Sequence, residues 1–383
     1  MAGIYVHIPF CKQACHYCNF HFSTTLNLKN DFIEALLREI SLRKDYLGKD
    51  AIETIYFGGG TPSILDGKDL ELIIENLVHQ FDCSRVTEIT LESNPDDMEA
   101  GKIKSWKRAG INRLSVGIQS FVDEDLKWMN RSHSGDQAEK CIHFAQDEGF
   151  SNISADLIYG YPQLSDDGWR KNVQKALELK IPHLSCYALT IEPKTALQHF
   201  IQAGKAEQPS AEDQARQYIL LMQWLEDSGY EHYEISNFSL PGMRSRHNSS
   251  YWQGKKYIGI GPSAHSYDQR SRQWNVSNNN QYIQSLKNNV VPFDTEELTP
   301  VQELNEYIMV SLRTRDGINL NEILRRFGVD IKNQLLANSK RWLNDGNMIL
   351  HDHCLILSRE GKLLADGIAA HLFFEKEPSE SPR

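Results

Sequence analysis

Three cysteines within eight residues carry the most specific chemistry in the sequence. Cys11, Cys15 and Cys18 form a CxxxCxxC run. Thiolates are the ligands of iron–sulfur clusters, and one tight loop can supply three sulfurs to a cubic cluster while the fourth iron has no protein ligand. Zinc is the alternative metal, with His16 or His21 as a further ligand, but zinc usually takes four ligands and no second cysteine pair follows. The run therefore predicts a cluster loop with one iron open to another molecule.

A glycine run and a set of polar residues could serve the same site. The string FGGGTP, Phe57 to Pro62, permits positive φ and close approach of the backbone to a ligand, although a glycine run alone is more often a turn. Glu92, Gln119, Arg131 and Asp156 lie near the ends of later strand-like segments. Singly, each is more typical of a helix cap or a surface group. Together, two carboxylates, an amide and a guanidinium could bind one polar ligand.

The elements that must position these residues alternate between short strand-like runs and longer segments of helical period, which predicts a parallel sheet with crossover helices. Strands are expected at Ile4–Ile8, Thr54–Phe57, Glu88–Glu92, Arg113–Ile118, Ile153–Ile158 and Leu184–Leu189. Six βα units are two short of a closed eight-stranded barrel, so we expect an α/β fold with an incomplete (βα)6 barrel. Ligands bind at the carboxyl ends of the strands in such sheets, where the motifs lie.

The pattern changes after the sixth unit, and we expect four segments. Residues 1–230 form the partial barrel, and 231–298 form a connecting region with an HNxxYW loop that begins at His247. Residues 299–373 form a winged-helix-like α+β module of three helices, two paired strands and a last helix. Residues 374–383, rich in Glu, Ser and Pro, form a disordered tail.

Composition limits the classes of function. The formal charge of −10 argues against a general nucleic-acid binder, because neutralising phosphates needs a basic surface. No basic and apolar leader precedes Ile4, and no stretch approaches the roughly 18 uninterrupted apolar residues of a membrane span. We therefore expect a cytoplasmic protein. The remaining cysteines, Cys83, Cys141, Cys186 and Cys354, fit small buried hydrophobes.

The CxxxCxxC run directly after the first strand resembles the radical S-adenosylmethionine (SAM) superfamily. Within it, nearly the whole chain, roughly Ile4 to Phe373, resembles the family of oxygen-independent coproporphyrinogen III dehydrogenases and HemW-type heme chaperones. The resemblance implies a [4Fe–4S] cluster on the three cysteines, SAM at the open iron, and an electron donor for the cluster. It also implies the positions that contact SAM: Tyr5, Tyr17, Gly59, Gly60, Thr61, Glu92, Gln119, Arg131 and Asp156.

Two departures favour the chaperones over the dehydrogenases. The dehydrogenase motif continues with a further cysteine, whereas Asn19 and Phe20 follow Cys18 here. The dehydrogenases also carry a substantial extension before the tyrosine that matches Tyr5, and four residues precede it in this chain.

The string His247, Asn248, Tyr251 and Trp252 matches the heme-binding HNxxYW motif of the chaperones. Imidazole is a common axial ligand of heme iron, and aromatic rings offer flat apolar surface to a macrocycle. Without the family match, an ordinary hydrogen-bonded histidine would be the better interpretation of His247. His265 is a second candidate ligand, and Arg244 and Arg246 could pair with the propionates of heme.

Three functions remain open at this point. The first is a chaperone that binds heme and passes it to an acceptor protein, possibly a membrane-bound respiratory enzyme. The second is oxidative decarboxylation of coproporphyrinogen III. The third is a radical SAM methyltransferase or another heme-modifying enzyme on the same scaffold.

Overall fold

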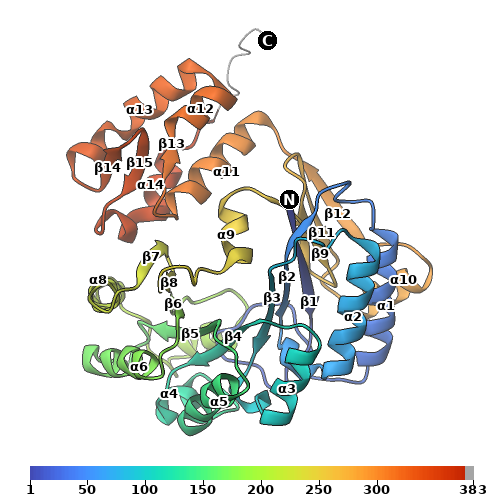
Figure 1. The fold of residues 1–383 in the computed structure, drawn as a ribbon. Helices are drawn as coiled ribbons and strands as arrows, with labels where there is room; N and C mark the ends of the chain where they lie inside the picture. Colours follow the sequence, from blue (N-terminus) through green and yellow to red (C-terminus); the bar gives the residue numbers. More distant parts are fainter. Residues whose placement is uncertain (376–383) are drawn as a thin grey trace.

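A computed structural model describes residues 1–375 and shows a curved sheet with helices on its outer side (Figure 1). Its first six strands run parallel and in sequence order: β1 (Ala2–Ile8), β2 (Ile52–Gly59), β3 (Glu88–Ser93), β4 (Arg113–Gln119), β5 (Ile153–Tyr159) and β6 (His183–Ala188). Side chains on both faces of β1 are buried, apart from the partly buried Tyr5, as expected for a parallel sheet covered on both sides. The expected incomplete barrel is confirmed.

The crossover segments form because apolar residues recur at helical spacing and polar residues cap the helix starts. These elements are α1 (Lys29–Leu42), η1 (Pro62–Ile64), α2 (Gly67–Gln80), η2 (Pro95–Asp97), α3 (Ala100–Arg108), α4 (Asp123–Trp128), α5 (Gly135–Asp147) and α6 (Asp166–Glu178). Helix α1 buries Phe32, Leu36 and Ile40 on one face. Asp66 begins α2 with a reciprocal capping box, and Ser134 does the same for α5.

The sheet continues beyond β1 and β6, which the sequence did not predict. Strands β9 (Lys256–Ile260), β10 (His265–Tyr267), β11 (Ser271–Asn275) and β12 (Phe293–Glu297) extend it past β1, and β8 (Asn237–Ser239) and β7 (Glu231–Glu234) extend it past β6. Within residues 1–375 the sheet has 12 strands. The segment 231–298 is therefore largely a continuation of the barrel wall. Its helices and those just before it are α7 (Ala196–Gln202), α8 (Ala211–Asp227), α9 (Arg246–Trp252) and α10 (Asn279–Lys287).

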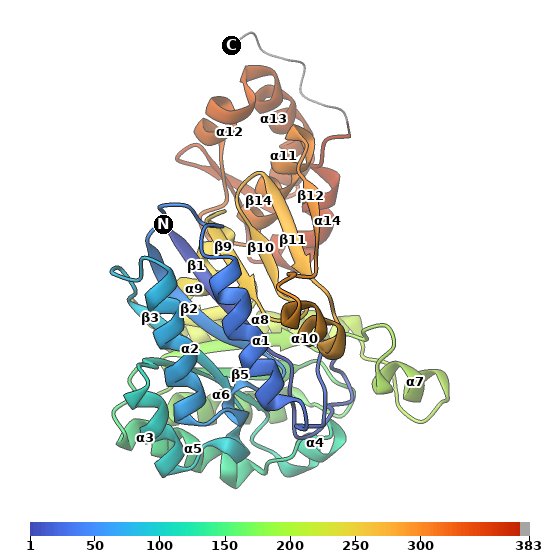
Figure 2. The ribbon, with the colours of Figure 1, turned by 90° about the vertical axis from the view of Figure 1, so that its right-hand side faces the viewer.

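The C-terminal segment has its own hydrophobic core and lies at one end of the barrel, with α9 between the two (Figures 1 and 2). Its elements are α11 (Pro300–Leu312), β13 (Ile318–Asn319), α12 (Leu320–Phe327), α13 (Val329–Asn344), β14 (Met348–His351), β15 (Cys354–Leu357), η3 (Gly361–Leu364) and α14 (Ala365–His371). The order of helices and paired strands follows the expectation, with a third short strand, β13, added to the sheet.

Phe374, which the sequence analysis placed in the tail, belongs to the described part of the chain. Phe374 is buried in the C-terminal core, and its backbone N–H donates to Asn305 Oδ1 at 2.8 Å. The rest of the predicted tail lies outside the described residues from 376 onward. Within residues 1–375, no helix is both long enough and apolar enough to cross a membrane.

Candidate functional site

The three cysteines lie in the loop between β1 and α1, at the carboxyl end of β1. The Thr61 hydroxyl donates to Cys11 Sγ at 3.3 Å, and Arg131 Nη1 donates to Cys15 Sγ at 3.2 Å. Burial raises the pKa of the Cys11 thiol to about 11, and burial also raises the pKa of Cys18. The thiols of Cys11 and Cys18 are therefore protonated, and they lose their protons when they bind a metal.

Arg131 fits the carboxylate of a small ligand beside these thiols. Its Nη2 donates to Asn94 Oδ1 and to the Gly117 carbonyl, both at 2.7 Å. Its Nε is buried without a partner. Because a buried guanidinium N–H left unpaired is costly, this nitrogen is a donor available to a ligand carboxylate.

The glycine run approaches the cluster loop too closely for side chains. Gly59 ends β2 with φ at 112°, and a Cβ there would lie 2.6 Å from the His7 ring. A Cβ on Gly60 would lie 2.7 Å from the Phe10 carbonyl oxygen and 3.0 Å from Cys11 Sγ. Glycine at both positions therefore lets the end of β2 pack directly against His7 and the start of the cluster loop.

Two carboxylates lie inside the barrel. Glu92 accepts from the Tyr56 hydroxyl at 2.8 Å and from the Gly59 N–H at 3.1 Å. Burial raises the pKa of Glu92 to about 7 and that of Asp156 to about 6. Such groups suit the amino and ribose hydroxyl groups of a ligand.

The remaining positions matched to SAM contacts lie around the same region. Burial raises the pKa of Tyr17, which is close enough to Arg131 and Cys15 for both to affect it. Tyr5 stacks on Tyr56 with ring centroids 6.0 Å apart. Gln119 ends β4 with φ at 66°, a conformation uncommon for residues other than glycine.

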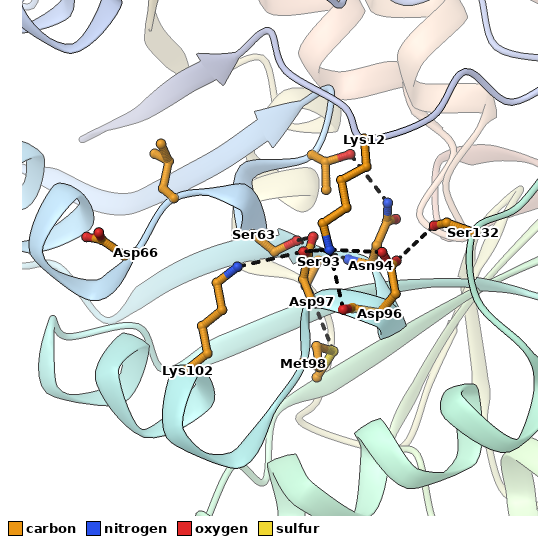
Figure 3. Close-up of polar contacts among 12 residues, drawn as sticks. Lys12, Ser63, Asp66, Ser93, Asn94, Asp96, Asp97, Met98, Lys102 and Ser132 are labelled. Carbon is orange, nitrogen blue, oxygen red and sulfur yellow. Dashed lines mark hydrogen bonds and ion pairs between the residues drawn. The ribbon is translucent and has the colours of Figure 1, made fainter. Parts of the chain in front are cut away.

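A charged network that the sequence did not predict fastens the cluster loop to the end of β3 (Figure 3). Lys12 binds Asp96 at 3.0 Å and also Asp97, whose side chain is 1% exposed. Asp97 also accepts from the Ser63 hydroxyl at 2.7 Å and lies 3.7 Å from Lys102. The position of Asp96 and Asp97 shortly after a barrel strand is the signal in the sequence that could have indicated this network.

A second region, a cavity of about 1280 Å³, lies between the barrel mouth and the C-terminal module. This volume exceeds the roughly 300–1,000 Å³ of ordinary ligand pockets. Its aromatic lining comes from the barrel wall, the cluster loop, α9 and α11: Tyr5, Phe20, Tyr233, Tyr251, Trp252, Tyr257, Tyr267 and Tyr307. The cavity also borders the cluster loop through Asn19 and Phe20.

The HNxxYW string is a helix, α9, where the sequence predicted a loop. Tyr251 and Trp252 line the cavity, whereas His247 and Asn248 do not. His247 is 1% exposed, and its two ring nitrogens are hydrogen-bonded to Thr54 Oγ1 and Tyr251 Oη, each at 2.8 Å. As placed, the His247 ring has no nitrogen available to an iron.

The two arginines before this string differ in position. Arg244 lines the cavity, and its Nη2 donates to Glu231 at 2.8 Å. Arg246 donates to the Thr87 hydroxyl at 2.8 Å and borders a separate small pocket of about 180 Å³. Of the two, Arg244 is therefore placed to meet a ligand in the cavity.

Comparison with known proteins identifies the family. Residues 5–176 match the radical SAM superfamily, and residues 298–364 match the HemN C-terminal domain. The chain is 32% identical over 371 residues to the heme chaperone HemW of Bacillus subtilis (strain 168), which covers 96% of this chain and 98% of that protein. The chain belongs to the HemW family of radical SAM proteins.

Other relatives of the HemW family support this assignment. The heme chaperone HemW of Escherichia coli (strain K12) is 36% identical over 268 residues, which is 69% of each chain. The mitochondrial radical S-adenosyl methionine domain-containing protein 1 of Danio rerio is 30% identical over 391 residues, 98% of this chain and 88% of that protein. The resemblance predicted from the motifs is confirmed.

The fold has a solved counterpart. Coproporphyrinogen III oxidase (HemN) from Escherichia coli, described as a radical SAM enzyme, superposes with a TM-score of 0.83 at 22% identity, covering 97% of this chain and 90% of that chain. Membership of the radical SAM superfamily implies a [4Fe–4S] cluster and SAM. The thiols of the cluster loop fit the iron–sulfur cluster. The Arg131 Nε, which has no partner within residues 1–375, fits the carboxylate of SAM.

Proposed function

We propose that this HemW-family protein is a heme chaperone that binds heme in the cavity and transfers it to acceptor proteins. The observation that carries the proposal is the cavity, which is large, lined by aromatic rings and adjacent to the cluster loop. Flat aromatic surfaces suit a macrocycle. The relatives named heme chaperones match most of the chain, which supports heme as the cargo.

The cofactor residues are part of the proposal. Cys11, Cys15 and Cys18 would hold a [4Fe–4S] cluster, and SAM would bind beside them. Its contacts would be Tyr5, Tyr17, Gly59, Gly60, Thr61, Glu92, Gln119, Arg131 and Asp156. When bound, the cluster and SAM supply one-electron chemistry. The chain's own residues orient them: Arg131 takes the ligand carboxylate, and Glu92 and Asp156 take amino and hydroxyl groups.

Acceptor and setting follow from the same proposal. The acceptor would be a membrane-bound respiratory hemoprotein, and a separate protein would supply electrons to the cluster. We place this exchange in the cytoplasm. We assign no role to nucleic acid, because the chain is acidic. The part of the HNxxYW string that would meet heme is Tyr251 and Trp252, which line the cavity.

The alternative is decarboxylation of coproporphyrinogen III, which the fold shared with HemN keeps open. Anaerobic reconstitution with iron and sulfide, hemin titration by absorbance and a coproporphyrinogen III turnover assay separate the two. One heme per chain without a decarboxylated product supports the chaperone. Turnover without stable heme binding would replace it with the dehydrogenase.

The cluster ligands are tested in the same preparation by counting bound iron. Cys15→Ala should lose the cluster, whereas Cys83→Ala, a thiol outside the loop, should retain it. Equal iron content in the two variants would contradict the ligand assignment.

A further inference from the structure

We infer that His265, rather than His247, supplies the imidazole that binds heme iron in the cavity. This inference rests on the proposed function, because it concerns the same cavity and the same cargo. It assigns the iron to the wall formed by the strands that extend the sheet past β1.

Of the other histidines of the cavity, His7 has both ring nitrogens hydrogen-bonded and His21 has one, Nε2. His7, His21 and His265 are its histidines within the described chain. His7 is hydrogen-bonded through both ring nitrogens, to the Tyr5 hydroxyl at 3.2 Å and to the His21 carbonyl at 3.1 Å. His21 Nε2 is bonded to Asn279 Oδ1 at 2.7 Å. Within residues 1–375, neither ring nitrogen of His265 has a hydrogen-bond partner, and its side chain is exposed to the cavity.

The backbone of His265 is held firmly. It begins β10, which pairs with β11 so that His265 lies opposite Trp274. The next residue, Ser266, is buried and accepts from the Gly259 N–H at 2.9 Å and from Arg43 Nη2 at 3.1 Å. A Cβ on Gly259 would lie 2.1 Å from the His265 carbonyl oxygen, so β9 and β10 approach closely here. A ligand on a rigid strand is positioned better than one on a free loop.

The surroundings of His265 suit a neutral ligand. Side chains alternate along a strand, so His265 and Tyr267 face the cavity while Ser266 faces away. Arg272 lies opposite Tyr267 on β11 and also lines the cavity. Burial, followed by the charge of Arg272, lowers the pKa of His265. Neutral imidazole is the form that binds metals.

The test is a hemin titration of the reconstituted protein and of His265→Ala, followed by absorbance and electron paramagnetic resonance. The variant should lose the spectrum of histidine-ligated heme, and its affinity should fall roughly tenfold or more, at least what an outer-shell partner contributes to a metal site. Added imidazole should restore the spectrum in His265→Ala. Metal-free protoporphyrin IX, which needs no axial ligand, should bind both proteins equally.

The outcomes separate the inference from the proposed function. An unchanged heme spectrum in His265→Ala would overturn the inference and leave the chaperone intact. Failure of the wild type to bind hemin would overturn both. Loss of protoporphyrin IX binding in the variant would also overturn the inference, since it would show a loss of cavity structure and not of an iron ligand.

Discussion

The carboxylates Glu92 and Asp156 are kept in the barrel interior without a cation directly bonded to them. Glu92 is bonded to a tyrosine and a backbone N–H, and Asp156 accepts from the Ser115 hydroxyl at 3.5 Å. Burial disfavours the charged form of both carboxylates and raises their pKa values. A cationic ligand such as SAM would favour the charged form, so the two carboxylates suit a positively charged ligand.

Because of this burial, the contribution of Glu92 itself to the stability of the apo-protein falls as pH rises. The pKa of Glu92 is raised from 4.5 to about 7, so the folded state holds a proton that the unfolded state has released within this window. Glu92→Gln should remove that loss, which is at most on the order of 3 kcal/mol. Urea unfolding at about pH 5 and about pH 8 measures it.

The matched control for Glu92→Gln is Glu75→Gln on the exposed face of α2, which should leave the pH dependence unchanged. The same change in the free energy of unfolding between the two pH values in the wild type and in Glu92→Gln would contradict a contribution from the burial of Glu92.

His247 has a structural role that can be measured. Its ring stacks on Tyr56 with centroids 4.9 Å apart and joins β2 to α9 through Thr54 and Tyr251. Burial lowers the pKa of His247 to about 3, so the ring stays neutral at ordinary pH. His247→Ala should cost about 2–4 kcal/mol of stability, measured by chemical denaturation.

The neighbouring variant Asn248→Ala serves as the control for His247→Ala and should cost far less. If His247→Ala loses heme while its stability is unchanged, the structural role is contradicted.

The sequence suggested His247 as an iron ligand because composition and motif cannot reveal that both ring nitrogens are hydrogen-bonded. The cysteines were predictable because their spacing alone defines the loop.

At the scale of elements, ion pairs that need no bound cluster hold the cluster loop in place. Lys12 joins the loop to η2 through Asp97, which is nearly fully buried. Asp97→Asn would leave Lys12 and Lys102 without their shared anion, and we expect a loss of roughly 1–3 kcal/mol. Iron release from the reconstituted protein to a chelator should become several-fold faster.

The control for this network is Asp136→Asn, which breaks an exposed pair with Lys140 on α5. Exposed pairs contribute little, so iron release should not change. Equal rates for wild type and Asp97→Asn would show that the cysteine loop is ordered by its metal alone.

The six barrel strands were predictable to within one or two residues at most ends, because each is a short strand-like run between segments of helical period. Strands β9 to β12 were not. They are short, interrupted by glycine at Gly261, and β12 is exposed along its whole length, so no alternation marks them. Strand β9 pairs with β1, which lies about 250 residues away along the chain, and such a contact leaves no local signal.

At the scale of the whole molecule, one arginine joins the two cores. Arg313 Nη2 lies 3.2 Å from Glu234, whose side chain is 1% exposed, and the Arg313 guanidinium lies over the Trp252 ring. The Ile235 N–H donates to the Arg313 carbonyl at 3.0 Å. The C-terminal module is thus attached beside the cavity.

Arg313→Ala should leave Glu234 buried without its charge partner, at a cost of about 3 kcal/mol. In calorimetry we expect the C-terminal module to melt before the barrel. Arg341→Ala, which removes an exposed pair with Asp345, is the matched control. A single unchanged transition in Arg313→Ala would show that the remaining contacts, which include the Arg272–Glu306 and Arg359–Glu226 pairs, join the two cores without Arg313.

The cavity has one wall from the sheet and one from α11, and this has a kinetic consequence. A ligand that touches both walls stabilises the closed arrangement by its own binding free energy, so departure of the ligand and separation of the walls become a single coupled equilibrium. The residence time of a ligand that contacts both walls would then depend on how readily the C-terminal module separates from the barrel. A partner protein that binds the C-terminal module could therefore accelerate release of the ligand without contacting the ligand.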